Sequence, residues 1–302
     1  MKKFFALIIF LAAAGYFVGN YFVSFAILRG ENGEPPLAVA NIADPNLKAP
    51  AAPNFEKSME KIKSADGLEL YGEIFLPKEK SDRWAILVHG YGRDGTFAYD
   101  YAEEYLNRGW NVLIPDLRAA GHSEGKFITM GTFESQDLIL WAKKILETDK
   151  DAKIILHGVS LGGATVMMAS ALDIENLVAV VEDCGYTSAY EMFSAQLEKI
   201  FGLPEFPVMT LADIVCKIKT GAKISDAAPI VSVTQSKVPM LFIHGDADKL
   251  VPFEMMQKLF DTSNAPYKEK FVVEGAGHAD SKNKDPQLYF ERVFSFLNKF
   301  SA

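Results

Sequence analysis

From about residue 58 to the C-terminus, short apolar runs alternate with longer stretches in which apolar residues recur at helical spacing. The runs expected to form strands are 60–64, 68–76, 84–88, 111–114, 153–157, 177–182, 238–243 and 268–273. The stretches expected to form helices are 100–108, 132–147, 161–172, 252–261 and 285–299. This alternation is typical of a mostly parallel sheet with helices on both faces, so we predict an α/β fold.

Two local signals mark where these elements begin and turn. Asp66-Gly67 lies between the first two apolar runs and is a strong hairpin-turn dipeptide. Thr132 is a residue type that commonly caps helices, so we expect it to be the N-cap of the helix that follows it.

One long segment interrupts the alternation. Residues 184 to about 236 lie between the sixth and seventh predicted strands, and they are moderately apolar, with prolines at 204 and 207. A loop of this length in a compact domain is usually functional. We therefore predict a small helical cap over one end of the sheet; the alternative is an elaboration at the sheet edge, remote from any site.

The N-terminus is the longest apolar stretch of the chain. Phe4 to Leu28 contains no charged residue and, as a helix, would be roughly 37 Å long, which is enough to span a bilayer. Lys2 and Lys3 precede it, so we expect a single-pass signal anchor in the cell membrane with the rest of the chain on the extracytoplasmic side. The alternative is a cleaved signal peptide with Ala12-Ala13-Ala14 as the cleavage site and a secreted product. That reading leaves the apolar run from Tyr16 onward unexplained.

Residues 29–57 are rich in proline and alanine and lack periodicity, which is typical of an extended linker. The alternative is a loop packed along the domain surface. We therefore divide the chain into an anchor (1–28), a linker (29–57) and a folded domain (58–302).

Charge and cysteine content restrict the partners. The net charge is −8, and residues 29–302 carry 29 basic and 39 acidic side chains. This acidic balance argues against a nucleic-acid partner. Cys184 and Cys216 are the only cysteines, and the more ordinary interpretation is two buried small hydrophobic residues rather than a disulfide.

The candidate chemistry centres on a Gly-x-Ser-x-Gly pentapeptide at residues 158–162. It lies between a predicted strand and a predicted helix, and this context is the nucleophile-elbow pattern, in which a tight turn exposes the serine hydroxyl. The pentapeptide alone is a weak signal, but the flanking elements make Ser160 a credible nucleophile.

A serine nucleophile needs a base, normally a histidine. Of the five histidines, only His278 lies in a glycine-flanked loop after the last predicted strand, so we predict that it is the base. The other four are expected to support turns or to pack as ordinary side chains. They are His89, His122, His157 and His244.

The histidine should be oriented by a carboxylate on a loop between Ser160 and His278 in the sequence. Asp248 is the preferred candidate and Asp183 the second, whereas Asp246 is expected to cap its own turn. The chain order Ser160, Asp248, His278 is that of α/β-hydrolases rather than of trypsin or subtilisin.

An acyl-transfer site also needs two hydrogen-bond donors for the oxyanion. We expect the backbone N–H of Leu161, at the start of the helix, to be one of them. The other is expected to be the N–H of Tyr91, in the loop that follows the apolar run at 84–88.

Five motifs occur in order along the chain. They are LVHGYG at 87–92, PDLRAAGHS at 115–123, GVSLG at 158–162, HGDADKLVP at 244–252 and GAGH at 275–278. Together they resemble an α/β-hydrolase of the serine type. The chain is similar to bacterial membrane-anchored hydrolases and to cinnamoyl-ester-hydrolase-like carboxylesterases, a set often grouped with serine aminopeptidase-like proteins.

The resemblance implies a role for particular residues. It implies a triad of Ser160, Asp248 and His278, and an oxyanion hole at Tyr91 and Leu161. It also implies that a structural loop braces the site. The residues that match this loop are Asp116, Arg118 and Ser123.

These features predict a serine hydrolase that cleaves small carboxylic esters with a hydrophobic acyl or aryl group through an acyl-enzyme. The same triad could serve a peptidase, a thioesterase or an acyltransferase. A further alternative, from another class of protein, is a non-catalytic ligand-binding module on this fold. We expect no metal or organic cofactor, because no clustered Cys/His ligand set occurs. The sequence does not determine the oligomeric state.

Overall fold

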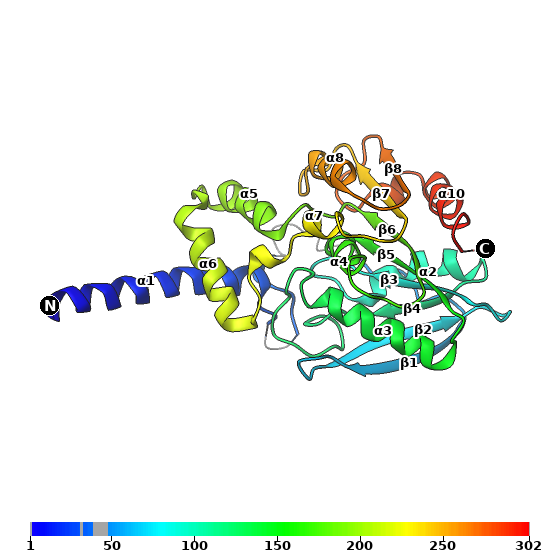
Figure 1. Cartoon of the computed structure of the whole chain (residues 1–302), viewed down its shortest axis with the longest axis horizontal. Coiled ribbons are helices and arrows are strands. Elements are labelled where there is room, and N and C mark those ends of the chain that lie inside the picture. The colour runs from blue at the N-terminus through cyan, green and yellow to red at the C-terminus, as the bar shows by residue number, and fades with distance from the viewer. Residues whose placement is uncertain (1, 31–32, 39–47, 302) are drawn as a thin grey trace.

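The computed structural model of the chain describes residues 2–30, 33–38 and 48–301. Within these residues eight strands form one sheet in the order β1-β2-β4-β3-β5-β6-β7-β8 (Figure 1). The strands are β1 (Glu56–Lys63), β2 (Glu69–Leu76), β3 (Arg83–Val88), β4 (Asn111–Pro115), β5 (Lys153–Val159), β6 (Leu177–Asp183), β7 (Met240–Gly245) and β8 (Lys268–Val273). The β1–β2 and β2–β4 pairings are antiparallel and the other five are parallel, so the prediction of a mostly parallel sheet is confirmed.

Helices cover both faces of the sheet, as predicted. The elements outside the cap are α1 (Lys2–Ile27), η2 (Gly95–Ala98), α2 (Tyr99–Leu106), α3 (Glu134–Thr148), α4 (Leu161–Ala169), α8 (Phe253–Thr262), α9 (Ser281–Lys284) and α10 (Pro286–Leu297). Buried apolar residues of α2 and α10 form one hydrophobic core with one face of the sheet. Those of α3, α4 and α8 form a second core on the opposite face. The central strands are therefore buried on both faces of the sheet, which explains why their sequences are continuous apolar runs.

Two predicted boundaries need correction. β1 begins at Glu56 rather than at residue 60, because its pairing with β2 continues to Glu56 opposite Leu76. Thr132 is not the N-cap of α3, which begins at Glu134. The Glu134 carboxylate accepts the backbone N–H of Thr129 instead, at 2.7 Å, and holds the turn before the helix.

The cap lies where the sequence predicts it, between β6 and β7. It consists of α5 (Ala189–Phe201), α6 (Glu205–Thr220), η3 (Ile224–Asp226) and α7 (Pro229–Ser232). Figure 1 shows α5 and α6 projecting from the sheet domain toward α1. Cys184 and Cys216 are both buried and free, so they do not form a disulfide.

Helix α1 is long and apolar enough, from Phe4 to Ile27, to cross a membrane, and it is the one such helix among the described residues. Its C-terminal end is held by the domain, because the Arg29 guanidinium donates to the carbonyls of Ser123 (2.7 Å) and Gly121 (2.6 Å). The division into anchor, linker and domain stays a prediction. Part of the predicted linker, at 31–32 and 39–47, lies outside the described residues.

Candidate active site

Ser160 stands at the junction of β5 and α4, at the carboxyl edge of the sheet. Its backbone has φ 58° and ψ −115°, a region that L-residues rarely adopt. The turn leaves no room for side chains at the two motif glycines. A Cβ on Gly158 would lie 2.1 Å from the Gly162 carbonyl oxygen, and one on Gly162 would lie 2.0 Å from the Val88 carbonyl oxygen. The glycines therefore permit the turn that presents the serine.

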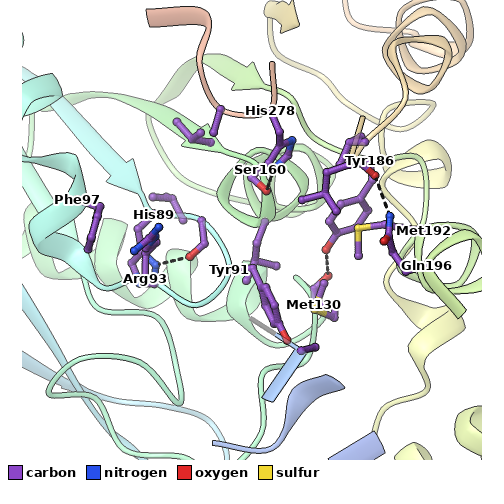
Figure 2. Close-up of a pocket in the computed structure, with 18 of the residues that line it drawn as sticks. His89, Tyr91, Arg93, Phe97, Met130, Ser160, Tyr186, Met192, Gln196 and His278 are labelled. Carbon is purple, nitrogen blue, oxygen red and sulfur yellow. Dashed lines mark hydrogen bonds between the residues drawn. The ribbon is translucent and has the colours of Figure 1, made fainter. Parts of the chain in front are cut away.

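Three side chains from three loops meet at this turn. The Ser160 Oγ lies 2.8 Å from Nε2 of His278, which follows β8. The Nδ1 of His278 lies 2.7 Å from an oxygen of Asp248, which follows β7. The structure thus brings together the nucleophile, base and carboxylate candidates in one hydrogen-bonded chain, and Figure 2 shows Ser160 and His278 facing each other.

Asp248 is held so that it remains ionised. Its Oδ1 accepts the backbone N–H groups of Leu250 (2.8 Å) and Val251 (2.9 Å). Burial alone would raise the pKa of Asp248, but hydrogen bonds from His244 and His278 hold it below its usual range. A buried carboxylate that is ionised at neutral pH keeps the proton of His278 on Nδ1 and leaves Nε2 free to accept one.

The other two aspartates considered lie elsewhere. The Asp183 carboxylate is bound by the hydroxyls of Ser281 and Tyr289, each at 3.0 Å, and not by His278. Asp246 accepts the backbone N–H of Gly275 at 2.6 Å, so it braces the His278 loop rather than its own turn. Geometry therefore favours Asp248 over Asp183.

Three of the remaining histidines do not contact Ser160, Asp248 or His278, and their partners lie elsewhere. His89 accepts the Leu117 N–H at 3.0 Å through Nε2, which ties two loops together at the strand ends. His157 is buried between the hydroxyls of Tyr105 and Tyr289, each 3.0 Å away, and burial lowers its pKa to about 3. His122 is largely exposed.

The oxyanion candidates lie next to the nucleophile. A Cβ on Gly90 would be 3.5 Å from the Ser160 Cβ, so the loop that carries Tyr91 passes directly beside the serine. Within the described part of the chain, the backbone N–H groups of Tyr91 and Leu161 have no hydrogen-bond acceptor. Their assignment to an oxyanion hole stays a prediction.

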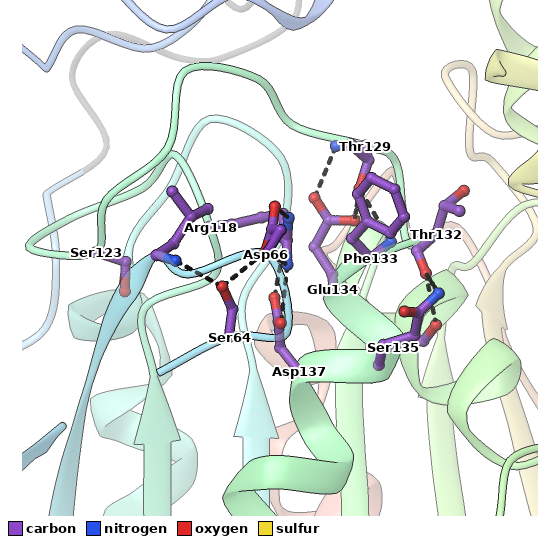
Figure 3. Close-up of polar contacts among 12 residues, drawn as sticks. Ser64, Asp66, Arg118, Ser123, Thr129, Thr132, Phe133, Glu134, Ser135 and Asp137 are labelled. Atoms are coloured by element: carbon purple, nitrogen blue, oxygen red, sulfur yellow. Dashed lines mark hydrogen bonds and ion pairs between the residues drawn. The ribbon is translucent and has the colours of Figure 1, made fainter. Parts of the chain in front are cut away.

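The loop after β4 is tied down by a buried ion pair, and Figure 3 shows its partners. The Arg118 guanidinium makes two 2.8 Å hydrogen bonds to Asp137 of α3 and two, of 3.0 and 3.3 Å, to Asp66. Asp116 accepts the backbone N–H of Gly95 at 2.8 Å, and the Ser123 hydroxyl donates to the Asp116 carbonyl at 2.7 Å. These hydrogen bonds fix the loop after β4 beside the site, and none of them involves Ser160. The three motif residues therefore support the position of this loop.

A second buried layer beneath the triad was missed by the sequence reasoning. His244 Nε2 lies 3.3 Å from an oxygen of Asp248 and 2.9 Å from the Val251 carbonyl, to which it donates. Burial opposes the charged form, but the carboxylates of Asp248 and Glu182 raise the pKa of His244. Burial also raises the pKa of Glu182 to about 8. The signal in the sequence was that β6 ends in Glu182-Asp183 and the neighbouring β7 ends in His244-Gly245.

Cys184 also lies beside the triad. Its Sγ and the ligand atoms of Asp248 and His278 lie within 4.8 Å of one another. Burial raises the pKa of the Cys184 thiol well above its usual range, so it stays protonated and is a poor metal ligand. Asp248 and His278 of this group belong to the candidate triad, and the protonated Cys184 lies beside them.

Ser160 lines a cavity of about 590 Å³. Its walls come from the loop after β3, from the cap, and from α1, which contributes Phe22, Phe25 and Ala26. The apolar lining residues of the cap are Met192, Phe193, Leu197, Ile200, Phe201 and Met209. This volume lies in the range of roughly 300–1,000 Å³ that holds small-molecule ligands.

Comparison with known proteins identifies a family and a fold for this chain. Residues 66–217, about half of the chain, match the family described as X-Pro dipeptidyl-peptidase (S15 family). The Bacillus subtilis protein YqkD is 28% identical over 248 residues, which cover 82% of this chain and 81% of YqkD.

Two solved structures share the fold. The Pyrococcus furiosus esterase Pf2001 superposes with a TM-score of 0.69 at 22% identity, covering 86% of this chain and 98% of the esterase. Est1E of Butyrivibrio proteoclasticus, solved with ferulic acid bound, gives a TM-score of 0.63 at 20% identity, covering 80% and 98%. The chain belongs to the S15 family and is an α/β-hydrolase enzyme of the serine hydrolase class.

Proposed function

We propose that this protein hydrolyses carboxylic esters through an acyl-enzyme formed on Ser160. The observation that carries the proposal is the chain of short contacts from Ser160 Oγ to His278 (2.8 Å) and from His278 to Asp248 (2.7 Å). A serine so placed has a base in contact and a carboxylate that orients the base, which are the parts that nucleophilic catalysis requires.

The steps follow from these contacts. His278 takes the proton of Ser160 as the hydroxyl oxygen attacks the ester carbonyl, and Asp248 stabilises the resulting imidazolium. The N–H groups of Tyr91 and Leu161 stabilise the oxyanion of the tetrahedral intermediate. His278 then protonates the departing alcohol, and a water molecule that it activates releases the acid from Ser160.

The test is labelling by a fluorophosphonate probe together with hydrolysis of p-nitrophenyl butyrate. Wild type should be labelled on the peptide that contains Ser160. The Ser160→Ala variant should not be labelled, and its kcat should be lower than that of wild type by about 10,000-fold or more. Ser232→Ala, on α7, serves as the matched control and should behave as wild type. Full esterase activity in a folded Ser160→Ala protein would refute the proposal.

The family match favours a second candidate, a dipeptidyl-peptidase activity that releases X-Pro dipeptides. The same triad would then attack an amide rather than an ester. Rates on glycyl-prolyl-p-nitroanilide and p-nitrophenyl butyrate at equal concentration separate the two. An amide rate within about tenfold of the ester rate would favour the peptidase, because esters are intrinsically the easier substrates.

The proposal also includes an anchored enzyme, with α1 crossing the cell membrane and the sheet domain on the extracytoplasmic side. The apolar length of α1 supports this arrangement. Protease added outside intact cells should digest the domain. If the domain is digested only after the cells are lysed, it lies on the cytoplasmic side and the proposed topology is wrong.

A further inference from the structure

Helix α1 is part of the wall of the catalytic cavity. Phe22 and Phe25 line the same space as Ser160, and both rings meet Phe201 of the cap edge-on, with centroids 5.2 and 5.4 Å apart. The Tyr91 hydroxyl donates to the carbonyl of Ala26. The helix that would anchor the protein therefore also shapes the space that a substrate fills.

The free part of α1 is too short to cross a bilayer by itself. Every side chain from 4 to 14 is exposed, and these eleven residues form about 16 Å of helix, whereas a hydrocarbon core is about 30 Å thick. A membrane-spanning α1 must therefore carry Gly15 and the residues that follow it into the bilayer as well.

The next part of α1 is packed tightly against α6. A Cβ on Gly19 would lie 2.5 Å from the Leu211 carbonyl oxygen, and one on Gly15 would lie 3.0 Å from the Leu211 side chain. Glycines four residues apart allow such close approach between helices in membranes. Since α6 touches α1 at this depth, α6 must enter the same layer of the membrane.

The exposed surface of α6 fits that environment. Ile214 and Ile218 follow Leu211 by three and seven residues, so they continue its apolar stripe, and they are 52% and 67% exposed. Phe206, at the start of α6, is 75% exposed. An apolar surface of this kind beside an anchor helix is suited to lipid.

The charged residues of α6 are Glu205, Asp213, Lys217 and Lys219. The Lys217 ammonium donates to the Gly221 carbonyl at the C-terminal end of the helix. Asp213 accepts the backbone N–H and the hydroxyl of Ser225, each at 2.9 Å, and Lys219 lies over the ring of Phe127 at 5.6 Å. The apolar stripe therefore meets the membrane without carrying these charges into it.

The cavity itself is apolar at one end and polar at the other. The cap and α1 supply the apolar end, as described above. At the other end Lys282 pairs with Asp100 at 2.6 Å, and Arg93 lies over the ring of Phe97 at 4.4 Å. Figure 2 shows Arg93 and Phe97 on the opposite side of Ser160 from Met192 and Gln196.

We propose that the substrate is a single-chain amphiphilic ester taken from the membrane leaflet in which the cap lies. Its acyl chain lies between α1 and the cap, its polar head lies toward Arg93 and Lys282, and its ester bond lies at Ser160. This inference rests on the proposed esterase function and adds the class of substrate and its route.

The test uses the full chain reconstituted in phosphatidylcholine vesicles. One probe, monopalmitoylglycerol, is embedded in the vesicles, and the other, p-nitrophenyl butyrate, is dissolved in water. The double variant Ile214→Glu/Ile218→Glu should release palmitate at least about tenfold more slowly than wild type, because two carboxylates would replace the apolar side chains that face the lipid. Its rate on the dissolved ester should stay within about twofold of wild type.

The control is Leu288→Glu on α10, an equally drastic change at a residue that is 40% exposed and remote from α1. It should match wild type on both probes. If the double variant has a lowered melting temperature, the single variant Ile214→Gln gives the same comparison with less perturbation.

The outcomes separate the two proposals. If wild type cleaves the dissolved ester and the double variant releases palmitate as fast as wild type, the inference is overturned and the esterase function stands. An equal loss on both probes in a variant with an unchanged melting temperature also overturns the inference. If wild type cleaves neither probe, the proposed function fails.

Discussion

The two sides of the catalytic cavity are built in different ways. On the sheet side, backbone turns and buried hydrogen bonds set the positions of Ser160, His278 and Asp248, with almost no free space around the elbow glycines. On the cap side, exchangeable apolar side chains of α5, α6 and α1 line the space. Under the proposed function, the sheet side would determine the chemistry, whereas the cap side would select the substrate and could change without loss of the reaction.

The strongest test of the sheet side compares two aspartates. Asp248→Asn should lower kcat about 10,000-fold, because the amide no longer holds His278 in the required tautomer. Asp183→Asn should cost less than about tenfold in kcat, since Asp183 is bound to Ser281 and Tyr289 instead. Steady-state hydrolysis of p-nitrophenyl butyrate measures both. Similar losses in both variants would contradict the assignment of Asp248.

A steric test compares two glycines of the same site. Gly162→Ala should lower kcat about 100- to 1,000-fold, the size expected when an oxyanion donor is displaced, because its methyl group would push the Val88 carbonyl and the loop behind it. Its melting temperature should also fall.

Gly277→Ala is the matched control, since a Cβ there meets no atom within 4 Å. Thermal unfolding measures the melting temperature of both variants, and esterase assays measure their kcat. Equal tolerance of alanine at the two positions would mean that the elbow is looser than its geometry implies.

A change on the cap side should alter selectivity instead. Leu197→Phe reduces the space at the apolar end of the cavity, so kcat/KM for p-nitrophenyl decanoate should fall about tenfold while that for the acetate ester stays near wild type. Leu203→Phe, outside the cavity lining, is the control. A matched loss on both esters would show that the cap side also sets the chemistry.

The smallest expected effect is a change in the pH dependence of stability, and it comes from Glu182 in the buried layer beneath the candidate triad. Burial raises the pKa of Glu182 from 4.5 to about 8, so between these values the folded protein holds a proton that the unfolded chain releases. Its contribution to stability is present below pH 4.5 and is lost as the pH rises to about 8, with a slope of at most about 1.4 kcal/mol per pH unit.

Glu182→Gln removes this titration and should flatten the decline in the free energy of unfolding over that window. Urea unfolding at pH 5, 6.5 and 8 measures the slope, with the exposed Glu175→Gln as the control. An unchanged slope in Glu182→Gln would mean that another group carries the pH dependence.

Much of the sheet side could be predicted from the sequence, because its signals are local. A Gly-x-Ser-x-Gly between a β-branched run and a helix needs only the geometry of one turn, and His278 stood out by its loop and its place after the last strand. Helix boundaries were less certain, as the start of α3 shows, because the Glu134 carboxylate satisfies the turn in place of Thr132.

The sequence by itself determined the order of strands and helices, the apolar N-terminal segment and the candidate triad residues, since each rests on short-range periodicity or a turn motif. Only the tertiary structure showed that His278 contacts Asp248 rather than Asp183, brought His244 and Glu182 beneath the candidate triad, and packed Gly19 of α1 against Leu211 of α6. These contacts join residues far apart in the chain, and their geometry depends on how whole elements pack. No local pattern in the sequence carries that information.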